Sequence, residues 1–310
     1  MISLILRGRI GNQLFMYAYA EALRQMRGGK EKIRIYDYEV LNEKWENSLR
    51  YYPIENVEYV HYKYPKDFTS LARFLCIHLI YKIIDKLDWF RRFEVEKHLK
   101  NKLYKKGIII CENGFIEPPI NAPENIMLYG YFQSEKYFKN YKEVVLRNLS
   151  LDSEIEKISS DYINKIKNRN SVCISIKVEH NVGNSLYDVC GKDYYEKAIA
   201  YINDHVDNPL YFICSDNVDY VLKHFIDPNK YDCVCQDKSL PVHISLAIMG
   251  LCNHFIISNT SFGWWAQYFS NYPQKTVIAP SPWMRVKMPI DIYQSNWKFI
   301  EVSDYINNGN

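Results

Sequence analysis

Short runs of apolar residues alternate along the chain with stretches in which apolar residues recur at helical spacing. Residues 2–6 form a β-rich apolar run, a glycine-containing turn follows, and residues 13–26 repeat apolar positions as one face of a helix does. The chain therefore opens as strand, turn and helix. Further strands are predicted from the apolar runs at 33–36, 107–111 and 127–131. Between these runs the hydrophobic pattern is too irregular to predict the order of helices and strands.

The second half of the chain has a regular alternation. Apolar runs predict strands at 172–176, 210–214, 231–235, 254–258 and 276–279. Helical patterns fill the gaps at 194–206, 218–225, 241–252 and 262–271. Strands separated by helical crossovers are typical of an α/β protein with a doubly wound parallel sheet. The charged stretch 150–170 is the candidate junction, so we expect domains at 1–155 and 156–310.

A long stripe of apolar and basic residues runs from residue 71 to residue 90. Its repeated charges argue against a membrane-spanning helix, which needs ~20 mostly apolar residues. Two readings remain open. The stripe is either an ordinary packed helix or helical pair, or a basic and aromatic surface, residues 71–93, that docks on a membrane.

Composition narrows the class of protein. With 310 residues, 47% of them hydrophobic, the chain is long enough for two α/β domains with a substantial core. The 39 basic and 36 acidic residues leave a net charge of +3. This balance disfavours a protein that tracks a nucleic-acid duplex, so no nucleic-acid partner is expected, but it allows a local phosphate pocket.

The eight cysteines form no CxxC pair that would chelate a metal or cycle a disulfide. Several lie inside apolar runs, and the N-terminus shows no charged leader followed by an apolar segment. We therefore expect buried thiols, a cytoplasmic protein and no metal site. If the 71–93 surface docks on a membrane, the protein would be peripheral on its inner face.

The turn after the first strand is the first candidate for ligand binding. It reads Arg7-Gly8-Arg9-Ile10-Gly11-Asn12-Gln13 and leads directly into a helix. Glycines allow backbone N–H groups to approach a ligand, and a helix N-terminus favours an anion. A tight structural turn would explain the two glycines equally well.

The segment 258–266 is the second candidate, since it joins an apolar strand to a helix. Asn259, Thr260 and Ser261 are residues that cap helices, and with Phe262 they would present hydroxyl and free N–H groups to a diphosphate without a metal. The alternative is simple capping followed by tryptophan packing. Asp216 ends another strand at the ligand-binding edge of the predicted sheet, where it is either a ligand contact or a helix cap.

Three strings in these segments resemble the α-1,2-fucosyltransferase family. Residues 8–18 resemble its GGLGNQxFQYA signature, residues 258–265 its SNSTFSWW motif, and residues 212–217 its F-x-x-SDD segment. The resemblance covers the N-terminal loop and nearly all of 170–300, whereas 30–165 match weakly. It implies a GT-B-like fold of two Rossmann-like domains facing a cleft, with the donor nucleotide in the C-terminal domain and Asp216 reading guanine.

The implied reaction is inverting transfer of L-fucose from GDP-L-fucose to a sugar hydroxyl. The expected acceptor is the 2-OH of a galactose-type residue in an oligosaccharide or a lipid-linked surface glycan. The family resemblance implies no cofactor beyond the donor substrate. The donor-binding residues that it implies are Arg7, Gly11, Asn12, Gln13, Ser175, Asp216, Asn259, Thr260, Ser261 and Phe262.

One segment departs from the family pattern. Where the family has HxRRGD, this chain reads Ser175-Ile176-Lys177-Val178-Glu179-His180, although both flanks align. Departure of GDP leaves negative charge on the β-phosphate, which fixed cations stabilise. Lys177 supplies a point charge but not the bidentate fork of a guanidinium. Either Arg7 or Arg9 compensates, or the donor has changed.

The general base is predicted in the loop after this altered strand. The candidates, in order, are His180, Glu179 and Asp188, and a solvated His180 without a catalytic role is the alternative. Two rival functions follow from the altered segment. One is a transferase that uses a different nucleotide sugar, and the other is a nucleotide- or glycan-binding protein that has lost turnover.

Overall fold

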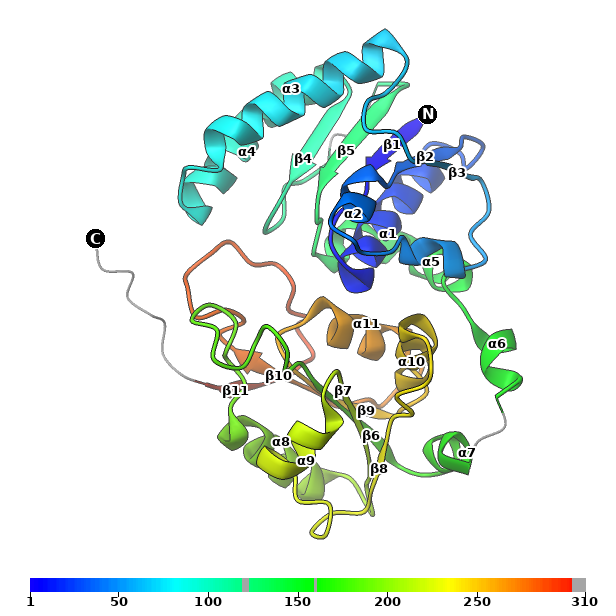
Figure 1. The fold of residues 1–310 in the computed structure, drawn as a ribbon, viewed down its shortest axis with the longest axis vertical. Helices are drawn as coiled ribbons and strands as arrows, with labels where there is room; N and C mark the ends of the chain where they lie inside the picture. Colours follow the sequence, from blue (N-terminus) through cyan, green and yellow to red (C-terminus); the bar gives the residue numbers. More distant parts are fainter. Residues whose placement is uncertain (119–122, 159–160, 303–310) are drawn as a thin grey trace. The chain divides into compact units, whose positions relative to one another are not determined.

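The computed structural model describes residues 1–118, 123–158 and 161–302 and shows two compact units (Figure 1). The first comprises Met1–Ser150 together with Met288–Tyr293, and the second comprises Leu151–Lys287 with the chain from Gln294 onward. The sequence had suggested a single junction after residue 155. In the structure the division falls at 150/151, and a short C-terminal segment returns to the first unit.

The first unit contains a five-stranded parallel sheet with the order β3-β2-β1-β5-β4. Its strands are β1 (Ile2–Ile5), β2 (Ile33–Tyr36), β3 (Val57–Val60), β4 (Ile108–Cys111) and β5 (Ile126–Gly130). The helices are α1 (Ile10–Met26), α2 (Tyr38–Asn42), α3 (Phe68–Ile84), α4 (Trp89–Lys105) and α5 (Lys142–Asn148). The described residues of this unit also contain three 3₁₀ turns, η1 (Ser48–Tyr51), η2 (Glu135–Tyr137) and η3 (Lys139–Tyr141).

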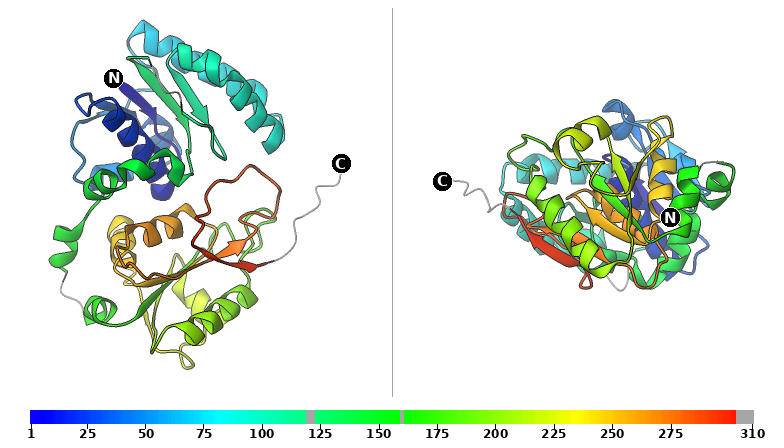
Figure 2. Two further views of the ribbon diagram at one scale, coloured as in Figure 1. Left: turned by 180° about the vertical axis from the view of Figure 1, so that it is seen from behind. Right: turned by 90° about the horizontal axis from the view of Figure 1, so that it is seen from below.

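Helices α3 and α4 pack on β4 and β5, as Figures 1 and 2 show. Their buried side chains meet Ile5, Ile110 and Tyr129, which project from three strands of the sheet. The apolar stripe at 71–90 is therefore not one helix but parts of two, which is the helical-pair reading. The chain breaks at residues 85–88, where the Asp88 carboxylate accepts the backbone N–H of Arg91 at 2.9 Å and caps α4.

The second unit contains a six-stranded parallel sheet with the order β11-β10-β9-β6-β7-β8. Its strands are β6 (Ser171–Ile176), β7 (Leu210–Ser215), β8 (Cys233–Cys235), β9 (His254–Ile257), β10 (Val277–Ser281) and β11 (Lys298–Glu301). The helices are α6 (Asp152–Glu156), α7 (Asp161–Asn168), α8 (Lys192–His205), α9 (Val218–His224), α10 (Val242–Met249) and α11 (Ser261–Phe269).

Both sheets reverse their direction of winding at one point. In the first unit the reversal falls between β1 and β5, and in the second between β6 and β9. Ligands of open α/β sheets bind at such switch points, outside the carboxyl ends of the strands. The α/β class and the doubly wound C-terminal sheet are confirmed, and the two switch points direct attention to the loops that follow these four strands.

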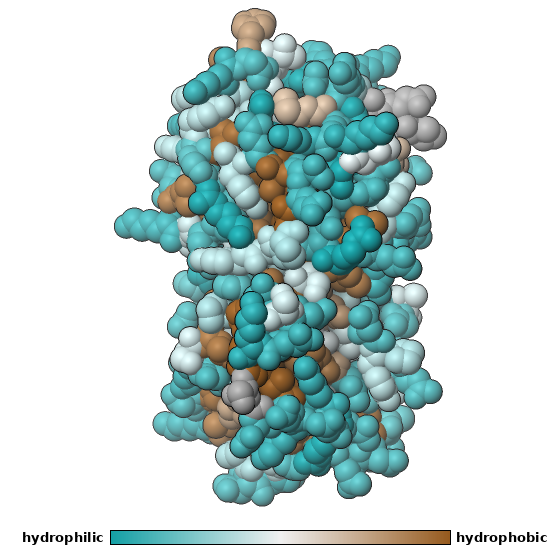
Figure 3. Space-filling view, turned by 90° about the vertical axis from the view of Figure 1, so that its right-hand side faces the viewer, coloured by the Kyte–Doolittle hydropathy of each residue, from teal (hydrophilic) through white to brown (hydrophobic). Residues whose placement is uncertain are grey.

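The hydrophilic surface (Figure 3) and the burial of most cysteines are typical of a chain folded around a hydrophobic core. Hydrophilic side chains predominate on the face seen in Figure 3, and hydrophobic ones show in the spaces between them. Five of the eight cysteines are buried, three are half-buried, and all eight are free thiols. The expectation of buried thiols therefore holds for five of them. In the described part of the chain, no helix is long and apolar enough to cross a membrane.

Candidate functional site

The loop after β1 lies at the switch point of the first unit and has a backbone that only glycine suits. Gly8 has φ +69°, and a Cβ atom there would lie 2.6 Å from the amide nitrogen of Asn12. The Asn12 side chain in turn accepts a hydrogen bond from Gln133, just beyond β5, at 2.8 Å. The signature loop is thus tied to both strands that flank the switch point.

Gln13 holds this loop in place through the hydrogen bonds of its side chain. Its side chain is fully buried, and its amide nitrogen donates to the carbonyl oxygens of Gly8 and Glu46 at 2.8 and 2.9 Å. Its amide oxygen accepts the backbone N–H of Ser48 at 2.8 Å. These hydrogen bonds involve both polar atoms of the Gln13 side chain. Gln13 therefore links the loop to residues 46–48 and does not face a ligand. Gly11 is buried in the first turn of α1.

Arg7 is held by acidic and aromatic partners. Its guanidinium lies 2.7 Å from Glu112 and 3.5 Å from Glu39, and 4.6 and 5.0 Å from the ring centroids of Tyr129 and Tyr131. Burial, the largest single effect, lowers the pKa of Arg7, but the combined effects of Glu112, Tyr129 and Tyr131 raise it above its ordinary value. Arg7 is therefore a fixed cation whose charge is already paired within the first unit.

A pocket of about 310 Å³ opens at the same edge of this sheet. It is lined by Ile5, Tyr36, Tyr38, Glu39, Asn42, Glu43, Lys63, Phe74 and His78. Aromatic faces combined with a few convergent polar groups are typical of small-molecule sites. His78 donates to the carbonyl oxygen of Phe74 at 2.9 Å, and its other ring nitrogen lies 3.2 Å from Glu39.

The switch point of the second unit brings Ser175 and the start of α11 together. Ser175 is buried at the end of β6, and its carbonyl oxygen accepts the backbone N–H of Ser258 at 3.0 Å. A Cβ atom on Gly263 would lie 3.0 Å from the Ser175 hydroxyl, so glycine allows the first turn of α11 to approach β6 closely.

The N-terminus of α11 directly follows the end of β9. Thr260 caps the helix, since its hydroxyl accepts the N–H of Gly263 at 3.1 Å, and Ser261 and Phe262 form the half-exposed first turn. The helix dipole favours an anion at this end of the helix. Asn259 is buried and accepts the amide of Asn181 at 3.3 Å, which links this turn to the loop after β6.

Lys177 and Asp216 form an ion pair between the loops after β6 and β7. The Asp216 carboxylate also accepts the backbone N–H groups of Val178 and Glu179 at 2.8 and 3.2 Å. Asn217, not Asp216, caps α9, because its side chain accepts the N–H of Tyr220 at 3.1 Å. The capping alternative for Asp216 is therefore wrong, and its carboxylate anchors the segment that departs from the family pattern.

The three base candidates lie in the loop after β6 in different settings. Glu179 and His180 are exposed, and His180 adopts a left-handed backbone with φ +65°. Such a conformation is uncommon for a residue other than glycine and occurs at functional sites and in turns. Asp188 is half-buried, and its carboxylate accepts the N–H of Gly183 at 2.8 Å. Asp188 therefore stabilises the loop.

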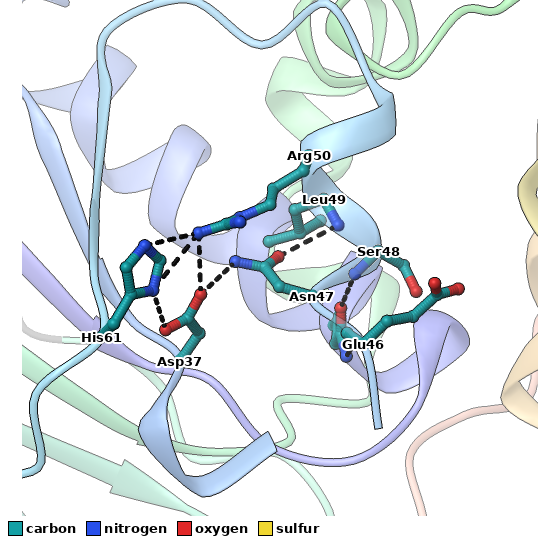
Figure 4. A network of polar contacts seen from close by, with 8 residues as sticks. Asp37, Glu46, Asn47, Ser48, Leu49, Arg50 and His61 are labelled. Carbon is teal, nitrogen blue, oxygen red and sulfur yellow. Dashed lines mark hydrogen bonds and ion pairs between the residues drawn. The ribbon is translucent and has the colours of Figure 1, made fainter. Parts of the chain in front are cut away.

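A polar network that the sequence did not predict lies in the first unit (Figure 4). It centres on Asp37, which directly follows β2 and has no exposed surface. One carboxylate oxygen lies 2.7 Å from Nδ1 of His61, and the other accepts the amide of Asn47 at 2.9 Å and faces Arg50 at 3.5 Å. The sequence signal that could have identified Asp37 was a carboxylate at the carboxyl end of a predicted strand. In the sequence, this signal was applied to Asp216 alone.

Metal-ligating side chains do not gather in the described residues. No three His, Cys, Asp or Glu side chains in 1–118, 123–158 and 161–302 are placed to hold a metal ion together.

Two α/β units, each built on a parallel sheet with a switch point, have the fold of a GT-B-like glycosyltransferase. The fold resembles solved fucosyltransferases: NodZ from Bradyrhizobium, with a TM-score of 0.53, 13% identity and coverage of 87% of this chain and 92% of that one. A second structure, NodZ α-1,6-fucosyltransferase co-crystallized with GDP, gives a TM-score of 0.51 with the same identity and coverage.

The chain belongs to glycosyl transferase family 11, whose family model matches residues 1–301. It is 26% identical over 286 residues to an α-1,2-colitosyltransferase of Escherichia coli, covering 90% of each chain. It is 21% identical over 309 residues to the O-antigen biosynthesis glycosyltransferase WbnK of Escherichia coli, covering 94% of this chain and 98% of that one. The family resemblance is confirmed, and the protein is a glycosyltransferase with a nucleotide-sugar donor and a glycan acceptor.

Proposed function

We propose that the protein transfers L-fucose from GDP-L-fucose to the 2-hydroxyl of a galactose-type residue in a surface glycan, with inversion at the anomeric carbon. The observation that supports this most is the start of α11, where a string resembling the fucosyltransferase motif meets the switch point between β6 and β9. A helix N-terminus in this position suits a diphosphate.

In this proposal the second unit binds the donor. The N–H groups at Ser261 and Phe262, with the Thr260 and Asn259 side chains beside them, would receive the diphosphate. Lys177 follows the central strand β6 and would add a positive charge as the sugar–phosphate bond breaks. The buried Ser175 would pack against the first turn of α11.

Asp216 is our candidate for reading the guanine. Its carboxylate can accept hydrogen bonds from the base, but it already accepts from Lys177, Val178 and Glu179. Reading the base therefore means sharing or exchanging these bonds. In the first unit, Gly11 and Asn12 belong to the loop at the switch point, and Gln13 would contribute by holding that loop in shape.

A different donor is the second candidate. The 26% identical relative is named an α-1,2-colitosyltransferase. Colitose is fucose without its 3-hydroxyl, so a donor pocket for one sugar differs from a pocket for the other by few contacts. The altered segment 175–180 is where such a difference would reside. The α-1,2 linkage in that name supports the same acceptor position under either donor.

Calorimetric titration in the presence of a chelator tests the donor. We expect GDP and GDP-L-fucose to bind selectively, at micromolar concentrations, over UDP, dTDP and CMP sugars. Selective binding of GDP-colitose over GDP-L-fucose would replace the first candidate with the second. Selectivity for a nucleotide other than GDP would contradict both. Nucleotide binding without transfer from any donor would indicate a binding protein that has lost turnover.

We also propose that α3 contacts a membrane surface that carries anionic lipid. Large apolar side chains project from this helix at Phe68, Leu75, Leu79 and Ile83, with exposed fractions of 85%, 52%, 62% and 63%. Residues 68–106 hold ten Lys and Arg against four Asp and Glu, a net charge of +6 in a chain whose total is +3. An apolar stripe flanked by cations matches the interface of an anionic bilayer.

A further inference from the structure

The sequence places two arginines in the second unit, and they lie near opposite edges of its sheet. Arg169 shortly precedes β6 at the amino edge, where it pairs with Asp232 at 2.5 Å. Arg285 follows β10 at the carboxyl edge, which is the edge where open α/β sheets bind their ligands. Arg285 is therefore the arginine of this unit on the side of the proposed donor site.

The guanidinium of Arg285 has no acidic partner in residues 1–118, 123–158 and 161–302. The side chain is half-buried, and within these residues its Nε is shielded from solvent without a hydrogen-bond acceptor. Nε of Arg92 also lacks an acceptor there, but the terminal nitrogens of Arg92 bind Asp85 at 3.3 and 3.1 Å. A shielded N–H without an acceptor costs free energy, which a bound anion that supplies the acceptor would recover.

Hydrogen bonds connect the backbone of Arg285 to the start of α11. Its N–H group donates to the carbonyl oxygen of Leu186 at 3.1 Å. The next residue, Tyr187, accepts the side-chain amide of Asn259 at 3.1 Å through its own carbonyl oxygen. Asn259 directly precedes Thr260, which caps α11. Because β10 also pairs in parallel with β9, the loops that follow these strands start side by side.

The charges around the start of α11 leave room for a bound anion. The first turn of the helix contains no acidic residue that would repel one. Lys177 supplies a positive charge after β6, but its ammonium is paired with Asp216. The carboxylate of Asp188 accepts the N–H of Gly183 at 2.8 Å and is thus bound to its own loop. An anion at α11 would meet the helix dipole and the guanidinium of Arg285.

We propose that Arg285 binds the β-phosphate of the donor and supplies the guanidinium that segment 175–180 lacks. This inference rests on the proposed function. The sheet order β10-β9-β6-β7 places Asp216 after β7, the start of α11 after β9, and Arg285 beyond it after β10. A nucleotide with its base at Asp216 and its diphosphate at α11 presents its terminal phosphate to the loop after β10.

A guanidinium suits this phosphate better than the neighbouring lysine does. It donates two parallel N–H bonds to phosphate oxygens and carries a charge that does not titrate, whereas Lys177 offers a point charge that Asp216 shares. The same contact stabilises the negative charge that develops on the β-phosphate as the diphosphate departs. Arg7 belongs to the first unit and is already paired with Glu112 there.

The test compares the affinities for GDP and GMP by calorimetric titration in the presence of a chelator. Arg285→Gln should weaken GDP binding by about 10–100-fold and leave GMP binding nearly unchanged, because GMP has no β-phosphate. Arg285→Lys keeps the charge and loses the fork, so its loss of GDP affinity should be smaller. Arg169→Gln removes the paired arginine at the opposite edge and is the matched control, which should bind both nucleotides as the wild type does.

The ratio of the two affinities separates a phosphate contact from a structural role. Wild-type GDP affinity in Arg285→Gln, or an equal loss for GDP and GMP, would overturn this proposal alone. If denaturant titration shows that Arg285→Gln does not fold, the GDP-to-GMP ratio in Arg285→Lys decides, and an unchanged ratio overturns the proposal. Wild-type protein that selects another nucleotide would contradict the proposed function, and the diphosphate and monophosphate of that nucleotide would then test Arg285.

Discussion

The side chain of Lys177 forms an ion pair with Asp216, so the loops that follow two neighbouring strands, β6 and β7, are joined by opposite charges. The same carboxylate accepts the N–H groups of the two residues after Lys177. The segment that differs from the family pattern is therefore anchored on the residue expected to read the nucleotide base. A change in the segment and a change in the donor pocket are physically coupled.

This coupling is measurable with a double-mutant cycle. We expect Lys177→Ala and Asp216→Ala to be non-additive by about 0.5–3 kcal/mol in the free energy of unfolding, because both side chains are less than one-quarter exposed. The exposed pair Lys238–Asp219 is the matched control in the same unit, with an expected coupling of about 0.2–1 kcal/mol. Denaturant titration of the six variants gives both values. Additive effects at Lys177 and Asp216 would contradict the anchor.

The signature loop gives a second prediction, at Gly8. Gly8→Ala should destabilise the protein by about 2–4 kcal/mol, because it adds a left-handed backbone penalty to a collision with the Asn12 amide. Gly28→Ala has the same sign of φ, at +88°, but nothing lies within 4 Å of the added methyl group. It should cost only about 1–2 kcal/mol. Equal losses in the two variants would mean that the Asn12 contact does not constrain the loop.

Glu96 gives a prediction about pH. Burial raises the pKa of Glu96 from 4.5 to about 7, although the hydroxyl of Tyr81 donates to it. The folded state therefore holds a proton that the unfolded state releases, and the stability contributed by this group falls as the pH rises from about 4.5 to 7. The full loss, present above pH 7, is at most about 3 kcal/mol.

Glu96→Gln removes the titration while keeping the shape of the side chain. We expect it to raise the free energy of unfolding at pH 8 and to change it little at pH 5, as measured by denaturant titration. Glu94→Gln, on the exposed side of the same helix, should stay within about 0.5 kcal/mol at both values. A Glu96→Gln variant that is less stable at pH 8 than the wild type would show that the buried group is ionised and well paired.

Vesicle binding tests the membrane contact of α3. The wild-type protein should sediment with vesicles that contain phosphatidylglycerol and much less with pure phosphatidylcholine, and salt should weaken the binding. Leu79→Glu should reduce sedimentation at least several-fold. Leu41→Glu, which alters a comparably exposed leucine of α2, is the control and should bind as the wild type does. Equal binding by the two variants would exclude the stripe as the contact surface.

The sequence predicted every central strand but only two of the four edge strands, β4 and β8. The run at 33–36 was predicted to the residue, because Ile33, Ile35 and Tyr36 are apolar and buried and only Arg34 interrupts them. The edge strands β3 and β11 were missed. Both contain charged residues and stay partly or largely exposed, so their local sequences resemble loops. Only pairing with β2 and β10 makes them strands.

Segments that are continuous in the chain were also easier to predict than contacts between residues far apart in the sequence. Residues 8–13 and 258–265 were predicted as candidate ligand loops from their sequence strings, because each segment is continuous in the chain. The contact between Asp37 and His61 joins residues 24 positions apart. It depends on the register between β2 and β3, and β3 was not predicted. Likewise, the sequence placed Lys177 and Asp216 at strand ends, but their pairing required the order of the sheet.

The most direct test of the account is the transfer reaction itself. The purified protein is incubated with GDP-L-fucose, a β-galactoside acceptor and a chelator, and the product linkage is determined by NMR. We predict an α-1,2-linked fucoside, which is the inverted product of a β-linked donor. A product of retained configuration, or one formed only from a sugar activated by a nucleotide other than GDP, would contradict the proposed function.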